Sequence, residues 1–513
     1  MKFIYIACSL VSVIILIPLL YISIHIFNSF ESFINHLWRI NTLTLTFNTI
    51  LLVGTVVLAS VLIAVPSAIL TIKSDLPFKK LLRVLLVMPI VFPSYIYALI
   101  FILAFGPKGL GQNLLSNIGI ETIPSIYGFW GTFLCLTFLC FPYIFISVSA
   151  SIMKIDSSYE EAAKSLGKSN LFTYKTIVLP LLKPSIIAGS ILVGLYVASD
   201  FGAVSLLHFR TFSSVIYNHY ETIQRGTAAS LSSIIIFIGI IVLWFYKTTG
   251  NSETQYRANA AVPRQGNIIL LGKYRWPMAI LFMLFIGITL IIPVWVLSSW
   301  AYDFSTNYNQ NFKIVYAFNS IYASLLGALT IVIISIPITI LIVAKNNLWT
   351  RFIEKASYTG FVLPGIVVAL SVVFFGINYL TPIYQTMTIL CIGYLILFLP
   401  VSIGVLKPVL LQINPKLGES AKTLGASNLR IWKNISIPLM APGSFAAFAI
   451  LFMLIMKELP ATLILAPLNF GTLATSIWTH STEANFGDAA IYSLILLLIT
   501  GTPMFILLNR GVK

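Results

Sequence analysis

The segment Glu161-Ala-Ala-Lys-Ser-Leu-Gly167 occurs a second time, with small changes, as Glu419-Ser-Ala-Lys-Thr-Leu-Gly425. The copies lie 258 residues apart, and this offset pairs further positions: Pro142 with Pro400, Ser169-Asn170 with Ser427-Asn428, Pro180 with Pro438, and Pro184 with Pro442. Upstream the offset is 271, and it pairs Asn48 with Asn319, Pro66 with Pro337, and Pro93 with Pro364. The chain is therefore an internal duplication. The change of 13 residues predicts a longer loop in the first half, near residues 106–123.

The composition excludes a water-soluble surface for a chain of this size. Of its 513 residues 58% are hydrophobic and only 9% are charged, against about 25% charged in soluble domains. The mean hydropathy is +0.96. A membrane-spanning helix needs about 20 apolar residues, and twelve such stretches lie near 3–26, 44–71, 81–106, 126–150, 184–207, 230–247, 277–300, 318–344, 356–380, 386–406, 443–467 and 488–509.

These stretches predict an all-α polytopic membrane protein of about twelve transmembrane helices, built as two parallel six-span repeats. Six spans is an even number, so both halves enter the bilayer in the same direction. The predicted parts are a first half (1–247) with a cytoplasmic loop at about 152–183, a polar linker (248–276), and a second half (277–513) with a loop at about 408–441.

The basic residues predict the orientation. The net charge is +16, from 31 Lys and Arg against 15 Asp and Glu. With the N-terminus in the cytoplasm, 25 of the 31 basic residues fall on that side, as the positive-inside rule requires. Five fall outside: Arg39, Lys108, Arg210, Arg225 and Lys313. We therefore expect both termini on the cytoplasmic side of a bacterial inner membrane. The placement of basic residues in cytoplasmic loops beside the lipid bilayer accounts for the net charge of +16. The charge therefore does not indicate a nucleic-acid partner.

Each repeated segment reads as a short cytoplasmic helix with defined ends. The starts are indicated by Ser157 with Glu160 and by Asn414 with Pro415, and the stops by Gly167 and Gly425. Ala162, Ala163 and Leu166 lie on or near one face in the first copy, as do Ala421 and Leu424 in the second. The small alanines would let another protein's backbone approach closely. A pair of such helices implies a two-fold partner, such as a homodimer. The alternative is an amphipathic loop helix on the lipid surface.

The two segments resemble the EAA loops of ABC-importer permeases, whose usual pattern is Glu-Ala-Ala, three residues, then Gly. The second copy departs from that pattern only at Ser420. In that family each loop forms a coupling helix seated in a groove of an ATPase subunit. The resemblance covers nearly the whole chain as two fused permease halves. It implies ATPase-coupling roles for Glu161, Ala162, Ala163, Gly167, Glu419, Ala421 and Gly425.

Finer features resemble the fused ferric iron(III) permease branch of that family. They are the segments Ser199-Asp-Phe-Gly-Ala-Val-Ser-Leu-Leu207 and Lys457-Glu-Leu-Pro-Ala-Thr-Leu463. The resemblance implies ferric iron as cargo, delivered by a periplasmic or extracellular substrate-binding protein. One alternative is the same permease role for thiamine, phosphonate or another small solute. A second alternative is an ion-coupled secondary transporter.

No catalytic or cofactor-binding residue is predicted in this chain. The nearest approach to a phosphate loop is Gly167-Lys168-Ser169, but position 162 is Ala where such a loop has glycine, and no strand precedes it. ATP is therefore expected to be bound and hydrolysed by a separate subunit, an ATPase homodimer. Possible iron ligands in an outer loop show no repeated metal-ligand spacing, so the metal question stays open: Tyr217, His219, Tyr220 and Glu221.

Asp200 and Glu458 are carboxylates within predicted spans, and they are separated by the repeat offset of 258. At 1.5 Å per residue Asp200 lies about 24 Å along its span, toward the outer side. Ionisable residues at membrane depth are functional candidates. Both could line the outer part of the pathway and offer oxygen ligands to a ferric ion. The alternatives are a structural role at the gate, pairing of Glu458 with Lys457, or contact with interfacial water.

Two further features concern the predicted spans: prolines repeated within them and tryptophans near their ends. Prolines interrupt spans at matching places: Pro93, Pro142, Pro364 and Pro400. The tryptophans are expected as anchors at the membrane–water interface: Trp38, Trp300 and Trp478.

Overall fold

The computed structural model of the protein describes residues 2–28, 30–106, 109–116, 124–153, 155–156, 158–221, 227–237, 239, 268–307, 313–344, 347–361, 363–413 and 416–511. Its elements within these ranges are helices, joined by turns and one isolated bridge between Ser74 and Ile269. The expected all-α class is confirmed.

The two halves contain matching series of helices. The first series is α4 (Ile40–Lys73), α5 (Lys79–Val87), α6 (Ser94–Phe105), α7 (Leu110–Ser116), α8 (Phe129–Ile152), α9 (Ser158–Ser165), α10 (Asn170–Thr173), α11 (Leu179–Ser199), α12 (Gly202–Leu206) and α13 (Phe212–Glu221). The second is α17 (Val315–Ala344), α18 (Leu348–Ser357), α19 (Gly365–Tyr379), α20 (Met387–Gln412), α21 (Lys416–Thr423), α22 (Asn428–Ile431), α23 (Ile437–Met456), α24 (Pro460–Leu465), α25 (Leu473–Thr482) and α26 (Phe486–Gly511).

The duplication is visible in the helix boundaries. The starts of α9 and α21 are 258 residues apart, and so are two π-helical turns, Tyr174–Val178 and Trp432–Ser436. The predicted insertion in the first half is also confirmed, because α7 lies between α6 and α8. In the second half a single short turn (Thr381–Ile383) joins α19 to α20.

The length and composition of the described helices support nine membrane spans, or ten if the bent pair α1 (Lys2–Ile15) and α2 (Ile17–Asn28) forms one. That pair bends by 47°. Two further predicted stretches contain shorter apolar helices, Thr227–Phe237 and α19. Each predicted stretch thus contains an apolar helix, while the count of twelve spans stays a prediction.

Two stretches expected as continuous helices, 184–207 and 443–467, are broken, so that expectation was wrong. The α11 helix ends at Ser199 and α23 ends at Met456, and a short helix follows each. The interruption expected at Pro93 is confirmed: the stretch 81–106 breaks before this residue, which precedes α6 with extended backbone (φ −66°, ψ 151°). Proline disfavours helical conformation in the residue before it. Pro364 precedes α19 in the same way.

The middle prolines behave differently from those two. Pro142 lies inside α8 and Pro400 lies inside α20, and both helices continue past them. The expectation that these two prolines interrupt their spans was therefore wrong. Both helices are apolar over their length, and most of each is buried inside the protein, where neighbouring helices can satisfy freed backbone groups.

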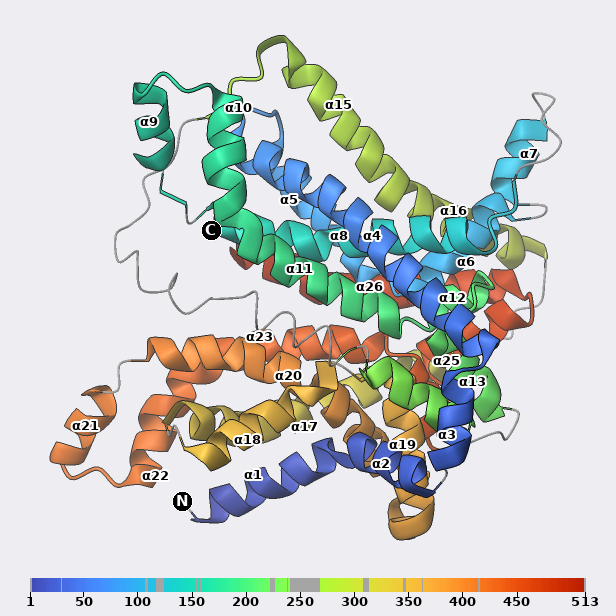
Figure 1. Cartoon of the computed structure of the whole chain (residues 1–513), viewed down its shortest axis with the longest axis vertical. Helices are drawn as coiled ribbons and strands as arrows, with labels where there is room; N and C mark the ends of the chain where they lie inside the picture. Colours follow the sequence, from blue (N-terminus) through green and yellow to red (C-terminus); the bar gives the residue numbers. More distant parts are fainter. Residues whose placement is uncertain are drawn as a thin grey trace.

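The first helices of each half contact helices of the other half. The α1 and α2 helices pack against α17, α18 and α19 of the second half. Conversely, α15 (Arg275–Ile286) packs against α5 of the first half, and α16 (Ile292–Asn307) lies between α6 of the first half and α26 of its own half. The Tyr97 hydroxyl on α6 donates a hydrogen bond to the Thr289 carbonyl oxygen, between α15 and α16, at 2.7 Å. Figure 1 shows this exchange, with α15 beside the first half and α1 beside the second.

The exchange predicts that the halves stay together when the linker is cut. A protease site inserted near residue 258 and cleaved in detergent should leave the two fragments bound, because each buries apolar helices of the other. Purification through a tag on one fragment would measure this. Recovery of the tagged fragment alone, still helical by circular dichroism, would contradict it.

Candidate functional site

The repeated segments form α9 and α21, two eight-residue helices that project from the same end of the molecule. Figure 1 shows them on the left, one from each half. The start of α1 and the end of α26 lie on that same side. We call this side the loop-helix end. The duplication therefore presents two equivalent helices to one side of the membrane protein.

The predicted glycine stops are confirmed in both loop helices. Gly167 has φ +71° and Gly425 has φ +82°, the left-handed conformation that glycine adopts without strain. The Lys168 amide donates to the Ala163 carbonyl at 3.0 Å, and the Ala426 amide donates to the Ala421 carbonyl at 2.9 Å. These are the closing bonds of a Schellman stop.

The predicted helix starts are less well tested. Ser157, Asn414 and Pro415 lie outside the described residues. At the start of α9 the Ser158 amide donates to the Asp156 carboxylate at 3.0 Å. Glu160, expected to complete a capping box, is instead buried and forms an ion pair with Lys73.

An exposed leucine directly follows each loop helix. Leu166 is 77% exposed and Leu424 is 87% exposed. Glu161 and Ala162 are also exposed, whereas Ala163 is buried against the chain. The expectation that Ala163 shares the open face with Leu166 was therefore wrong. The Glu419 side chain lies outside the described side chains.

At the opposite end, Asp200 lies at the break between α11 and α12. Its carboxylate Oδ1 accepts hydrogen bonds from the amides of Ala203 (3.0 Å) and Val204 (3.4 Å). The Ser94 side chain, at the start of α6, lies against the same carboxylate. Buried Asp200 therefore satisfies the first amides of α12, groups that a helix start otherwise leaves without partners.

Glu458 occupies the matching break in the second half. Its Oε1 accepts from the Ala461 amide of α24 at 3.2 Å. A side chain on Gly365, the counterpart of Ser94, would place its Cβ 2.8 Å from that oxygen. Glutamate is one methylene longer than aspartate, and the glycine leaves room for it. The Lys457 ammonium donates to the Ile90 carbonyl of the first half at 2.9 Å.

Beside these breaks, three aromatic rings join the two halves. The Phe201 ring lies 4.6 Å from Tyr217 and 4.7 Å from Trp478, between ring centroids. Tyr217 and Trp478 contact each other at 6.4 Å, and they occupy equivalent positions in α13 and α25, 261 residues apart. Trp478 is therefore buried between the halves, and its expected place at the membrane interface was wrong. We call these three residues the aromatic cluster.

Two asparagines hold the turns before α13 and α25. The Asn48 amide nitrogen donates to the Arg210 carbonyl at 3.0 Å, and that of Asn319 donates to the Gly471 carbonyl at 2.8 Å. Thr49 and Ser320, next along each helix, accept from the first amides of α13 and α25. The match between Asn48 and Asn319 is visible in the sequence, but the sequence does not indicate that these two residues hold the turns.

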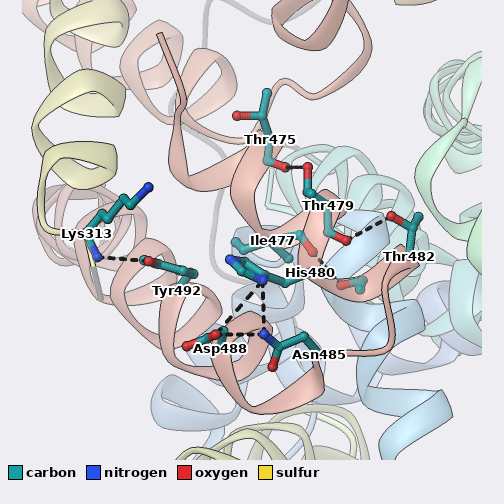
Figure 2. Close-up of polar contacts among 10 residues, drawn as sticks. Lys313, Thr475, Ile477, Thr479, His480, Thr482, Asn485, Asp488 and Tyr492 are labelled. Atoms are coloured by element: carbon teal, nitrogen blue, oxygen red, sulfur yellow. Dashed lines mark hydrogen bonds and ion pairs between the residues drawn. The ribbon is translucent and has the colours of Figure 1, made fainter. Parts of the chain in front are cut away.

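A polar network at the same end occurs in the second half. Figure 2 shows His480 of α25 with Asn485 and Asp488 beside it. His480 Nδ1 lies 4.0 Å from Asp488 Oδ2, and Asn485 donates to that oxygen at 2.8 Å. The Tyr492 ring stacks on His480 (5.7 Å), and its hydroxyl accepts from the Lys313 amide at 3.0 Å. The network thus fixes α26 to the segment before α17.

His219 matches His480 in the repeat, but Thr227 stands where the second half has Asp488. Within the described ranges, no three His, Cys, Asp or Glu side chains are placed to share a metal ion. Two of the residues that could coordinate iron, Tyr220 and Glu221, have side chains outside those described.

Comparison with known proteins agrees with this architecture. The family model for binding-protein-dependent transport system inner membrane components matches residues 60–249 and again residues 335–510. An Fe(3+)-transport system permease protein of Haemophilus influenzae is 32% identical over 392 residues, covering 75% of this chain and 77% of the relative. A probable ABC transporter permease of Sinorhizobium fredii is 24% identical, covering 84% of this chain and 81% of the relative.

A ferric transport system permease protein of Actinobacillus pleuropneumoniae is 23% identical, covering 81% of this chain and 64% of the relative. The two family matches include both loop helices and both helix breaks. The chain therefore belongs to the binding-protein-dependent transport system inner membrane component family, as two fused copies of its domain.

Proposed function

We propose that this chain conducts ferric iron into the cytoplasm, driven by ATP hydrolysis in a separate ATPase homodimer. The observation that carries the coupling is the pair of equivalent loop helices at one end, each followed directly by an exposed leucine. A two-fold partner could bind both in the same way. The iron proposal rests on the ferric permeases of Haemophilus influenzae and Actinobacillus pleuropneumoniae.

The loop-helix end would face the cytoplasm, with both termini on that side of the inner membrane. The count of basic residues in the predicted loops supports this orientation. The opposite end, with the aromatic cluster, then faces the substrate-binding protein. In this arrangement the aromatic cluster closes the outer end of the path between the halves. Closure of the ATPase dimer would move α9 and α21 together and separate the halves at that end.

For Asp200 and Glu458, the contacts support a structural role at this outer gate. Each carboxylate accepts hydrogen bonds from the short helix that follows it and packs at the start of α6 or α19. Within a bilayer a helix can break only where protein groups satisfy its backbone. The two acids would thus hold the breaks that position the gate. The pathway role is the alternative, in which their charge attracts the cation.

Charge reversal on the loop helices tests the coupling. Glu161→Lys together with Glu419→Lys should reduce the amount of co-purified ATPase at least about fivefold. Fivefold is the lower end of the change in affinity that coupled sites typically show. Glu31→Lys together with Glu483→Lys is the matched control, because it reverses two exposed glutamates that lie away from the loop helices. Undiminished co-purification of the ATPase with the double variant would refute the coupling role.

Amide substitutions separate the two roles of the acids. Asp200→Asn with Glu458→Gln keeps the accepting oxygens and removes the charge, so iron uptake should stay within about twofold of the unchanged protein. Alanine at both positions removes the caps and should lower the yield of folded protein, because each lost cap costs about 1 kcal/mol. Uptake kinetics and detergent-extracted yield are the measurements. Loss of uptake in the amide variant with a normal yield would instead establish the pathway role.

A further inference from the structure

We propose that the loop helix α9 is linked mechanically to the second half through the buried Lys73–Glu160 ion pair and the last turn of α4. The inference rests on the proposed coupling role of α9. It names Lys73 and Glu160 as positioning residues. They would carry the displacement of one loop helix to the junction between the halves.

The ion pair is the first link of this path. The Lys73 ammonium at the end of α4 contacts the Glu160 carboxylate on α9, and their side chains are only 8% and 4% exposed. Separating a buried ion pair leaves charges without compensation, at a high cost in free energy. The end of α4 is therefore expected to move with α9. Glu161, the next residue on α9, is exposed and is free to face a partner protein.

The same turn of α4 holds the described end of the linker between the halves. The Ile269 amide donates to the Lys73 carbonyl at 2.7 Å, and the Asp75 amide donates to the Ile269 carbonyl at 3.2 Å. The Leu271 amide donates to the Asp75 carboxylate at 2.9 Å. These bonds lie just before α15, which begins the second half. The backbone of Lys73 thus binds the linker while its side chain binds α9.

Neighbouring cations on α5 secure this turn further. The Arg83 Nε donates to the Thr71 carbonyl at 3.1 Å, and the Lys79 ammonium donates to the Ser74 carbonyl at 3.1 Å. Both satisfy carbonyl oxygens at the C-terminal end of α4, where a helix lacks internal partners. The turn is therefore bonded on three sides, to α5, to α9 and to the linker.

The duplication does not reproduce this arrangement. The position of Glu160 is occupied by Gly418 in the second half, and that of Lys73 is occupied by Ala344. The second half has a different ion pair, in which Lys407 of α20 contacts Glu354 of α18 at 2.5 Å. That pair is about one-third exposed, with side-chain values of 33% and 29%. Gly418 and Ala344 cannot form the same ion pair, and within the part of the chain that the structure describes α9 is the loop helix joined to the linker.

Hydrogen exchange on the purified full chain tests the link without reference to cargo. Glu160→Gln should speed amide exchange in α9 and also at Ile269 and Leu271, while α21 exchanges at its original rate. The charge-reversed pair, Lys73→Glu with Glu160→Lys, should restore slow exchange at both places. Glu354→Gln is the matched control, since it breaks an ion pair elsewhere and should leave α9 unchanged.

The functional readout is ferric iron transported per ATP hydrolysed, in liposomes holding the chain with its ATPase and binding protein. Glu160→Gln should lower this ratio by about fivefold or more, with the bound ATPase unchanged, and the reversed pair should recover it. A merely destabilising change would lower transport and hydrolysis in proportion. Faster exchange confined to α9, or an unchanged ratio, would overturn the inference. Loss of the coupling role itself would instead show as normal ATPase binding by the Glu161→Lys, Glu419→Lys variant.

Discussion

A helix that begins inside a protein needs partners for its first backbone amides, and the rest of the structure depends on how Asp200 and Glu458 meet this requirement. Each carboxylate accepts hydrogen bonds from the helix that begins after it. The chain can therefore turn between α11 and α13, and again between α23 and α25. Those turns bring Tyr217 and Trp478 into contact between the halves.

The duplication provides two similar halves, and the differences between them are also informative. Equivalent asparagines hold equivalent turns, as with Asn48 and Asn319. By contrast, the Lys73–Glu160 ion pair has no charged counterpart at the matching positions. A fused chain can acquire such differences because each half is encoded separately, whereas two copies of one chain cannot. The partner at the loop-helix end would then meet one helix joined to the linker through this ion pair and one with no charged residues at the matching positions.

Much of this fold could be predicted from the sequence where a residue has a local conformational preference. Gly167 and Gly425 mark the helix stops because glycine adopts positive φ easily. The change of repeat offset located α7 as an insertion. The resemblance to ABC-importer permeases is confirmed by the family matches.

Other features depend on contacts between distant residues, and hydropathy carries no information about them. An apolar stretch reads as one span whether or not a carboxylate interrupts it, so the breaks at Asp200 and Glu458 were missed. The exchange of α1 and α15 between halves was missed because an apolar helix does not specify its partner. Trp478 was misplaced for the same reason, since an aromatic ring suits the membrane interface and a buried contact equally well.

Uptake of radiolabelled ferric iron in iron-starved cells tests the central claim most directly, provided that the strain has no redundant iron importer. The account predicts that deletion of this chain abolishes uptake and that the intact chain restores it. It also predicts that the chain carrying Glu161→Lys and Glu419→Lys does not restore uptake, although it reaches the membrane in normal amounts. Unchanged iron uptake after deletion would contradict the iron assignment, and the cargo would then be sought among thiamine, phosphonate and other small solutes.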